Sequence, residues 1–198
     1  YARTKWEAEK YLMSISSKNF LVCAFRPSTV FGYSPRLRCD IVFNNLVACN
    51  FTKKRIEIKS DGSPWRPVVH VRDVCEAFLS GLVASDEKLN SKAFNVGIKN
   101  GNYTVKDLAL AAQSIIPDSK LIFTNEEIKD NRSYRVSFDR IHDQLGDYYA
   151  PSWNLQLGAN ELYNKFKEIS FGEEEFIGIK TNRLKMINHL LDSDIIDD

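Results

Sequence analysis

The sequence predicts an α/β fold, and three observations support this. Short apolar runs typical of strands alternate along the chain with longer segments in which apolar residues recur at helical spacing. Proline and glycine stand at many of the expected boundaries, where they end regular structure. Two of the runs, 20–25 and 93–96, are typical of central strands of a parallel sheet, and the rest is typical of a smaller α/β lobe.

In the first part of the chain, an amphipathic helix is followed by a strand that Pro27 stops. Residues 56–58 and 67–70 predict two short strands on either side of a turn at 60–64. Gly62 can adopt positive φ in that turn, and we expect the two strands to form a hairpin-like unit. In the second part, Thr104 to Asp107 has the form of a capping box, which predicts the start of a helix.

The same patterns give the full order of elements. The expected helices are 1–17, 41–51, 71–84, 105–115, 139–145, 155–169 and 180–191. The expected strands are 20–25, 56–58, 67–70, 93–96, 120–123 and 134–138. We expect loops at 26–40, 124–133 and 171–179, and an acidic tail at 192–198 that frays.

Composition excludes several classes of function. The 198 residues carry a net charge of +1, so no long-range attraction to nucleic acid or to a membrane surface is expected. No apolar run approaches the ~20 residues that a membrane helix needs. The four cysteines lack the short spacing of zinc or redox motifs, which fits a reducing, cytoplasmic compartment, although four cysteines could in principle form two disulfides. The three histidines are too scattered to predict a metal site.

Three motifs carry the functional prediction. Tyr1-Ala-Arg-Thr-Lys5 places a tyrosine and a lysine four residues apart on one helical face, a spacing that also occurs by chance. Arg26-Pro-Ser-Thr-Val-Phe-Gly32 follows the first strand. The stretch 56–71 contains a strand, a glycine turn, Arg66 and a His-Val helix start. Together these motifs resemble the extended short-chain dehydrogenase/reductase superfamily, and within it the NAD-dependent nucleotide-sugar epimerases and dehydratases.

The resemblance implies a domain organisation. The chain corresponds to the C-terminal part of a Rossmann-type enzyme, mostly its small substrate-binding lobe. Residues 1–40 would be a remnant of the NAD-binding domain, and 41–198 mainly the substrate-binding domain, with a strand near 93–96 returning to the Rossmann sheet. The family's glycine-rich phosphate loop and its supporting serine or threonine would precede Tyr1. We therefore expect the 198 residues alone to hold NAD poorly and not to turn over.

The resemblance also assigns a reaction to the opening pair. A free phenol titrates near pH ~10 and is a poor base at neutral pH, but a nearby cation favours the phenolate. Tyr1 would carry the proton, and Lys5 would lower its pKa and contact the nicotinamide ribose. The phenolate can then accept a proton from a sugar hydroxyl while hydride leaves the same carbon.

Further residues are assigned by the same resemblance. Ser28 and Val30, with Tyr1 and Lys5, would contact the cofactor, which is NAD or NADP. Arg66 presents a planar fork of donors that suits a diphosphate, although an arginine there could equally pair with a surface carboxylate. Thr29 stands where relatives often have asparagine, which puts the usual sugar contact in question. The expected substrate-binding residues are Thr29, Asn45, Leu46, Ile58, Arg66, Arg132 and Tyr134.

Three residues near the His-Val helix start are expected to be structural. His70 would fix the helix that begins at Val71, Arg72 would be a surface variation, and Asp73 would lie in the first helical turn.

Three functions remain open on the sequence. The first is an epimerase or dehydratase that transiently oxidises a ring hydroxyl of a nucleotide-diphosphate sugar. The second is a non-catalytic nucleotide-sugar-binding or regulatory member, and the third is an NADPH-dependent carbonyl reductase. Tyr1 and Lys5 argue against the second, and two arginines suited to a diphosphate argue against the third. The full-length protein would be a homodimer through a helix bundle that includes the Tyr1–Lys5 helix, and no nucleic-acid or membrane partner is expected.

Overall fold

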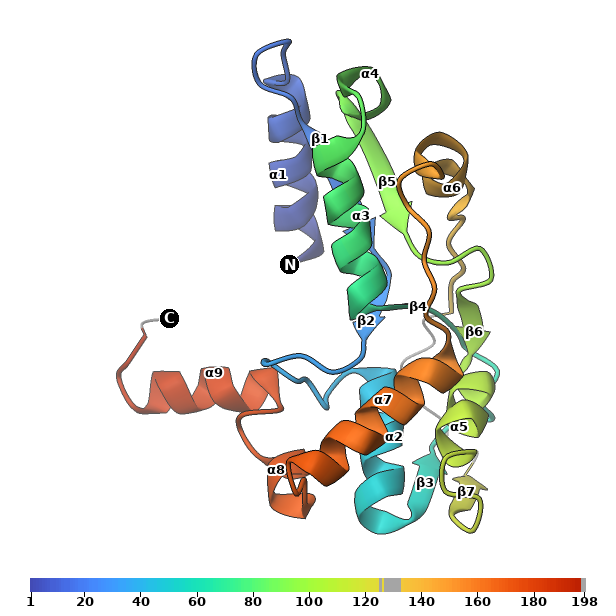
Figure 1. Cartoon of the computed structure of the whole chain (residues 1–198). Coiled ribbons are helices and arrows are strands. Elements are labelled where there is room, and N and C mark those ends of the chain that lie inside the picture. The colour runs from blue at the N-terminus through green and yellow to red at the C-terminus, as the bar shows by residue number, and fades with distance from the viewer. Residues whose placement is uncertain (125, 127–132, 197–198) are drawn as a thin grey trace.

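Helices alternate with strands along the chain, so the predicted α/β class is confirmed (Figure 1). The structure is a computed structural model that describes residues 1–124, 126 and 133–196. Its helices are α1 (Ala2–Ser14), α2 (Val42–Lys53), α3 (Val71–Val83), α4 (Asp86–Leu89), α5 (Val105–Gln113), α6 (Asp139–Leu145), α7 (Leu155–Glu168), α8 (Glu173–Ile177) and α9 (Arg183–Asp192). Its strands are β1 (Cys23–Pro27), β2 (Thr29–Phe31), β3 (Arg55–Ile58), β4 (Trp65–His70), β5 (Lys92–Val96), β6 (Asn102–Thr104) and β7 (Lys120–Phe123).

The strands form three small sheets. β1 pairs with β5, β2 with β4, and β3 with β7, in each case in parallel. β6 joins the other edge of β4 in an antiparallel pair. A parallel pair needs a long crossover between its strands, and helices such as α2 and α3 supply it here.

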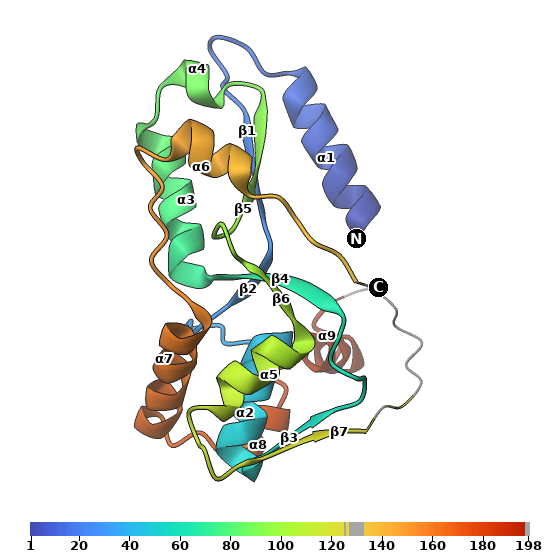
Figure 2. The same cartoon turned by 90° about the vertical axis from the view of Figure 1, so that its right-hand side faces the viewer.

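One half of the molecule is built around β1 and β5. Figure 2 shows α1 on one side of this pair and α3 on the other. The core of this half lies under α3 and α6 and includes Phe94, Phe138, Ile141, Leu145 and Tyr149. α1 contributes no buried residue, so this helix lies on the outside of the described structure.

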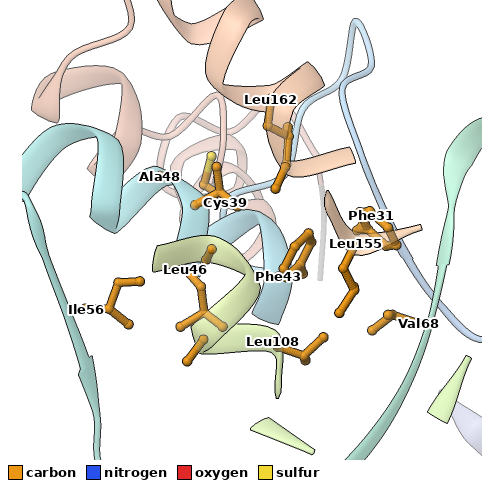
Figure 3. Packing of buried hydrophobic residues seen from close by; sticks show 14 of the residues in the cluster. Phe31, Cys39, Phe43, Leu46, Ala48, Ile56, Val68, Leu108, Leu155 and Leu162 are labelled. Carbon is orange, nitrogen blue, oxygen red and sulfur yellow. The ribbon is translucent and has the colours of Figure 1, made fainter. Parts of the chain in front are cut away.

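The other half has a larger core, in which three helices converge. Phe43, Leu46 and Ala48 of α2 pack against Leu108 of α5 and Leu162 of α7, with Ile56 and Val68 from the strands (Figure 3). The apolar residues of α7 recur at helical spacing, which is why one face of this helix is buried. The β2–β4 pair leads from this core to the half that carries β1 and β5, as Figure 1 shows.

The expected hairpin of 56–58 and 67–70 is wrong. β3 pairs with β7, and β4 lies between β2 and β6. Ile56 and Ile58 are drawn into the core below α2, whereas Val68 and Val69 are both buried within β4. A strand buried on both faces is a central strand, and its edges are occupied by other partners.

Other boundaries also differ from the prediction. The expected strand 134–138 is absent, because the N–H of Val136 donates to the Asn102 side chain at 2.8 Å rather than to a neighbouring strand. The expected loops 26–40 and 171–179 contain β2 and α8, and β6 and the short α4 were not predicted. β1 starts later than expected and includes Pro27 as its last residue.

The capping box is confirmed. Thr104 Oγ1 accepts from the N–H of Asp107 at 3.1 Å, and the Asp107 carboxylate accepts from the N–H of Thr104 at 2.8 Å. Within the described ranges, no helix combines the length and the apolar character needed to cross a lipid bilayer.

Candidate active site

Tyr1 and Lys5 lie on one face of α1, as their spacing predicts. The N–H of Lys5 donates to the Tyr1 carbonyl at 3.1 Å, and Lys5 Nζ lies 5.8 Å from the centroid of the Tyr1 ring. The Tyr1 side chain is almost fully open, with 93% of its surface exposed. The ammonium group and the phenol are therefore close enough to interact, in a position that a ligand can reach.

Arg26 of the Arg-Pro motif ties this helix to β1. Its guanidinium donates to both carboxylate oxygens of Glu9, with Nε at 2.9 Å from Oε2, and it lies 5.9 Å from the Trp6 ring. The hydrogen bond from Arg26 holds the pKa of the Glu9 carboxyl below its ordinary value. The motif thus positions the helix that carries Tyr1 and Lys5.

The junction of β1 and β2 carries the three expected contacts Ser28, Thr29 and Val30. The N–H of Ser28 donates to the Val96 carbonyl of β5 at 3.1 Å. Val30 lines a pocket of about 220 Å³ that also includes Gly32 and Arg38. The structure therefore places these residues at one end of the β1–β5 pair.

The hydroxyl of Ser28 fits a bound ligand. Its Oγ is buried and has no hydrogen-bond partner among the described residues. Buried hydroxyls are normally hydrogen-bonded, so an orphaned one marks a place for a polar group from outside the described structure.

Asn45 and Leu46 support the loop that follows β2. The side chain of Asn45 donates to the Cys39 carbonyl at 2.8 Å, and the neighbouring Asn44 accepts from the N–H of Gly32 at 3.0 Å. The Leu46 side chain lies in the core, 6% exposed. The side chains of Asn44 and Asn45 therefore hold the chain between Gly32 and Cys39 in place, whereas Leu46 contributes to the core.

The start of β4 lies beside the segment 133–135, which brings Arg66 and Tyr134 together. Trp65 accepts through its carbonyl from the N–H of Tyr134 at 3.5 Å and from Arg66 Nη1 at 2.9 Å. Arg135 covers the Trp65 ring, with its guanidinium carbon 3.8 Å from the centroid. Tyr134 is 47% exposed. The predicted Arg132 lies outside the described residues.

Ile58 is placed differently from the other expected contacts. Its side chain is 6% exposed and packs in the core below α2. Any contact of Ile58 with a base is therefore restricted to its backbone or to the small exposed part of its side chain.

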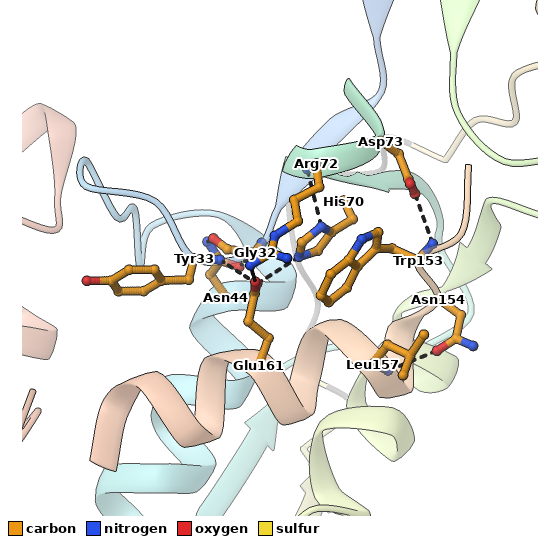
Figure 4. A network of polar contacts seen from close by, with 10 residues as sticks. All are labelled: Gly32, Tyr33, Asn44, His70, Arg72, Asp73, Trp153, Asn154, Leu157 and Glu161. Carbon is orange, nitrogen blue, oxygen red and sulfur yellow. Dashed lines mark hydrogen bonds and ion pairs between the residues drawn. The ribbon is translucent and has the colours of Figure 1, made fainter. Parts of the chain in front are cut away.

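A polar network around Glu161 was not predicted. The Glu161 carboxylate lies 2.8 Å from His70 Nε2 and 3.0 Å from Arg72 Nη2, and it accepts from the N–H of Tyr33 at 3.1 Å (Figure 4). The His70 ring stacks on Trp153, with centroids 4.0 Å apart. The network joins α7, the start of α3 and the turn after β2.

His70 caps α3, as expected from the sequence. Its Nδ1 accepts from the N–H of Arg72 at 3.3 Å, so the proton of the neutral ring lies on Nε2, which faces Glu161. Burial is the largest influence on His70 and lowers its pKa, against the opposing effect of Glu161. Arg72 lies at the surface as expected, with its side chain 62% exposed, but it also pairs with Glu161 and covers Trp153 at 4.8 Å.

Asp73 is both in the first turn of α3, as expected, and buried. Its carboxylate accepts from the N–H groups of Ser152 at 3.0 Å and Trp153 at 3.3 Å, which holds the entry to α7. Burial raises the pKa of Asp73 above its ordinary value.

Only indirect signals in the sequence point to this network. Glu161 is one charged residue among several on an amphipathic helix, and its spacing to His70 carries no pattern. The glycine at position 32 is a better sequence signal than Glu161, because a glycine can mark a tight turn or a close approach. The structure shows both here: the φ of Gly32 is +111°, and an added Cβ would lie 2.4 Å from His70 Nε2. In the described part of the chain, no cluster of His, Cys, Asp and Glu is arranged to hold a metal ion.

Parallel strand pairs linked by helices, with a Tyr–Lys helix beside them, define a Rossmann-type α/β protein. The family model described as the NAD dependent epimerase/dehydratase family matches residues 1–97. The predicted family resemblance is therefore confirmed over residues 1–97.

Solved structures give the same fold. A UDP-glucose 4-epimerase from Thermotoga maritima, solved with UDP-glucose, has 20% identity and a TM-score of 0.69, over 86% of this chain and 54% of its own. A UDP-glucuronic acid 4-epimerase from Bacillus cereus, solved with UDP-glucuronic acid and NAD, has 21% identity and a TM-score of 0.64, over 81% and 50%. RMD from Pseudomonas aeruginosa, complexed with NADPH, has 19% identity and a TM-score of 0.70, over 85% and 56%.

The chain thus spans about half the length of the solved structures that it matches. The family is described as NAD dependent, and relatives have been solved with NAD or NADPH. The predicted cofactor class is confirmed at the level of the family.

Proposed function

We propose that the whole protein is an NAD(P)-dependent epimerase or dehydratase of a nucleotide-diphosphate sugar. The observation that carries this proposal is the Tyr1–Lys5 pair, held by Arg26 beside the β1–β2 junction, where the hydroxyl of Ser28 has no partner among the described residues. The NAD dependence of the family and nucleotide sugars bound to solved relatives support it.

In this proposal each residue has a defined task. Tyr1 Oη accepts a proton from a sugar hydroxyl and later returns it, and the Lys5 ammonium stabilises the negative charge on that oxygen. The dinucleotide, when bound, supplies a hydride acceptor that returns the hydride later. Lys5, Ser28 and Val30 orient its nicotinamide end.

The remaining residues of the proposal recognise the substrate. Arg66 presents paired donors to the diphosphate, a geometry in which guanidinium groups bind phosphate well. Thr29 lies at the sugar side of the β1–β2 junction. Asn45, Leu46, Ile58, Arg132 and Tyr134 complete the proposed substrate-binding set.

A substrate panel tests the reaction. The whole protein is incubated with NAD or NADP and with UDP-, GDP-, CDP- and dTDP-sugars, and products are followed by nuclear magnetic resonance. We expect conversion of at least one sugar, and Tyr1→Phe should lower kcat by at least about 100-fold with a small change in KM. Tyr11→Phe is the matched control, because Tyr11 is an exposed tyrosine on the same helix.

Two results would overturn the proposal. One is reduction of small carbonyl compounds by NADPH with no conversion of any nucleotide sugar. The other is equal loss of turnover in Tyr1→Phe and Tyr11→Phe, which would mean that the helix matters but the Tyr1 oxygen does not.

The setting of the enzyme belongs to the same proposal. The four cysteines are free thiols, which fits a reducing compartment such as the cytoplasm. We also propose a homodimer through α1, whose Trp6, Tyr11, Leu12 and Ile15 are exposed apolar residues. Sedimentation of the whole protein at micromolar concentration tests this, and a monomer at all concentrations would contradict it.

A further inference from the structure

A basic pocket lies between the loop after β2 and α9. Its volume is about 380 Å³, which is within the usual range for small-molecule sites. The residues that line it are Arg36, Arg38, Ile179, Lys180, Arg183, Met186, Ile187 and Leu190. Among the described residues, none of the predicted cofactor or substrate residues lines it, but Arg36 and Arg38 also line the pocket that contains Val30.

Hydrogen bonds between the two segments fix the walls of this pocket. The N–H of Cys39 donates to the Thr181 carbonyl at 2.8 Å, and the N–H of Arg183 donates to Asp40 Oδ2 at 3.3 Å. The buried Thr181 hydroxyl donates to the Glu175 carbonyl at 2.6 Å, which holds the start of α9 against α8. The cations are therefore presented from two segments that are bound to each other.

The charge of the pocket is strongly positive. Arg38 is paired with Asp40 through two contacts of 2.9 Å, which leaves the rest of its guanidinium edge for another acceptor. Among the described residues, no ion pair within 4 Å joins the side-chain cation of Arg36, Lys180 or Arg183 to a carboxylate, although the backbone N–H of Arg183 donates to Asp40. Four cations against one carboxylate leave an excess that an anion would neutralise.

A neighbouring pocket provides the contrast. It has a volume of about 420 Å³, shares Ile179 and Lys180 with the basic pocket, and is lined by Glu174 and Glu175. Its two carboxylates disfavour an anion there. Among the described residues, no acidic side chain lines the basic pocket, and Ile179, Met186, Ile187 and Leu190 give it an apolar wall.

We propose that this pocket binds a phosphate-bearing small molecule. The phosphate lies among Arg36, Arg38, Lys180 and Arg183, and the apolar part of the ligand contacts α9. A phosphate monoester carries close to two negative charges at neutral pH and matches the excess of positive charge better than a single carboxylate does. Arginine forks also bind phosphate oxygens in pairs. The proposal does not depend on the reaction proposed for Tyr1.

Phenyl phosphate is a suitable probe, because it joins a phosphate to an apolar ring. Titration of the ¹⁵N-labelled chain, followed by amide chemical shifts, should move the signals of 36–40 and 179–190. Arg36→Gln and Arg183→Gln should each weaken binding by about tenfold, since each removes a charged hydrogen-bond donor. Both side chains are exposed, so both variants should keep the wild-type unfolding midpoint.

Lys18→Gln is the matched control. It removes one positive charge from the exposed turn between α1 and β1, which lies far from α9 in Figure 1, and it should leave the affinity within twofold of wild type. Benzoate should bind at least tenfold more weakly than phenyl phosphate. Uridine diphosphate is titrated in parallel. Tighter binding of uridine diphosphate than of phenyl phosphate would indicate a nucleotide ligand, and tighter binding of phenyl phosphate would indicate a simple phosphate ester.

Three results would overturn the proposal. Shifts confined to residues outside 36–40 and 179–190 would place the binding elsewhere. Equal weakening in Lys18→Gln and Arg183→Gln would mean that only the overall charge matters. Benzoate affinity equal to that of phenyl phosphate would remove the assignment to phosphate.

Discussion

Glu161 is the residue that joins most parts of the site. Its carboxylate contacts His70, Arg72 and the N–H of Tyr33, and its side chain is only 10% exposed. We expect Glu161→Ala to lower the free energy of unfolding by about 1–3 kcal/mol, because it leaves a buried imidazole N–H without its acceptor. Urea denaturation followed by circular dichroism measures the change.

Glu168→Ala is the control for that measurement. Glu168 lies on the same helix and pairs with Lys165 at 2.7 Å, but the pair is exposed to solvent. Exposed pairs contribute little to stability, so we expect the unfolding midpoint to stay near that of wild type. An equal loss in both variants would mean that helix α7 tolerates no alanine, and would contradict the role assigned to the Glu161 network.

The protonation of His70 should make stability depend on pH. Burial lowers its pKa in the folded chain, so the unfolded chain binds a proton more readily. The free energy of unfolding should therefore be unaffected by His70 above pH ~6.5 and should fall as the pH drops below that value. The added proton would lie on Nδ1, which now accepts from the N–H of Arg72.

Urea unfolding at pH 7.5 and pH 5.5 measures this effect. His70→Asn keeps an oxygen that can cap α3 but removes the titrating ring, so the difference between the two pH values should shrink. His189→Asn is the control, because His189 is exposed on α9. A pH difference that is unchanged in His70→Asn would contradict the prediction.

The residues of the site differ in how far the sequence could predict them. Tyr1, Lys5 and Arg66 belong to short motifs with defined spacing, so the sequence alone can nominate them as candidates. Glu161 meets His70 only because α7 packs across the turn at Gly32, and no local spacing records that contact. The contacts of Arg72 were not predicted for the same reason, since its partners Glu161 and Trp153 lie far along the chain.

On the scale of elements, the packing of α7 depends on Gly158. An added Cβ at this position would lie 2.4 Å from Phe31 Cε2 and 3.1 Å from His70 Cδ2. Alanine is the better helix former by about 1 kcal/mol, but overpacking in a core costs about 1–3 kcal/mol. We expect Gly158→Ala to lower the free energy of unfolding, as measured by urea denaturation.

Asn160→Ala tests the competing effect in isolation. Asn160 is exposed on the same helix, so alanine there should leave stability unchanged or raise it slightly. A rise in the free energy of unfolding for Gly158→Ala, like that allowed for Asn160→Ala, would contradict the prediction. It would mean that α7 does not approach Phe31 of β2 closely.

Helices were predicted better than strands, and the reason is physical. The apolar spacing of α3 and the capping box of α5 are local signals, and both helices were found near their true bounds. β2 and β6 have three residues each, which is too short for a periodic pattern. The hairpin prediction was wrong because β3 pairs with β7 and β4 pairs with β6, both of which lie later in the chain. Core packing, rather than the turn between β3 and β4, determines this pairing.

On the scale of the whole molecule, stability should be uneven. α1 contributes no buried residue and is held to β1 by the Arg26–Glu9 contact, whereas α2 buries half of its residues in the larger core. We expect the amides of α1 to be protected from hydrogen exchange at least about tenfold less than those of α2, because less burial opposes their opening. Mass spectrometry of exchanged peptides measures the ratio.

Arg26→Ala provides the matching variant. It should increase exchange in α1 and leave α2 unchanged, since only α1 is tied by this side chain. Protection of α1 equal to that of α2 in the wild-type chain would contradict this picture of the molecule.

The parallel pairing of the strands has a consequence for how the chain acquires its structure. Cys23 is paired with Lys92, and Arg55 with Lys120, so each of these pairs joins segments that are far apart in the sequence. To form such a contact, the chain must first lose the conformational entropy of closing a long loop. This loss precedes the stabilisation from the contact, so folding is slow. The helices can form early from local contacts, whereas the β1–β5 pair, beside which Tyr1 and Lys5 lie, must wait until the chain as far as Val96 is present.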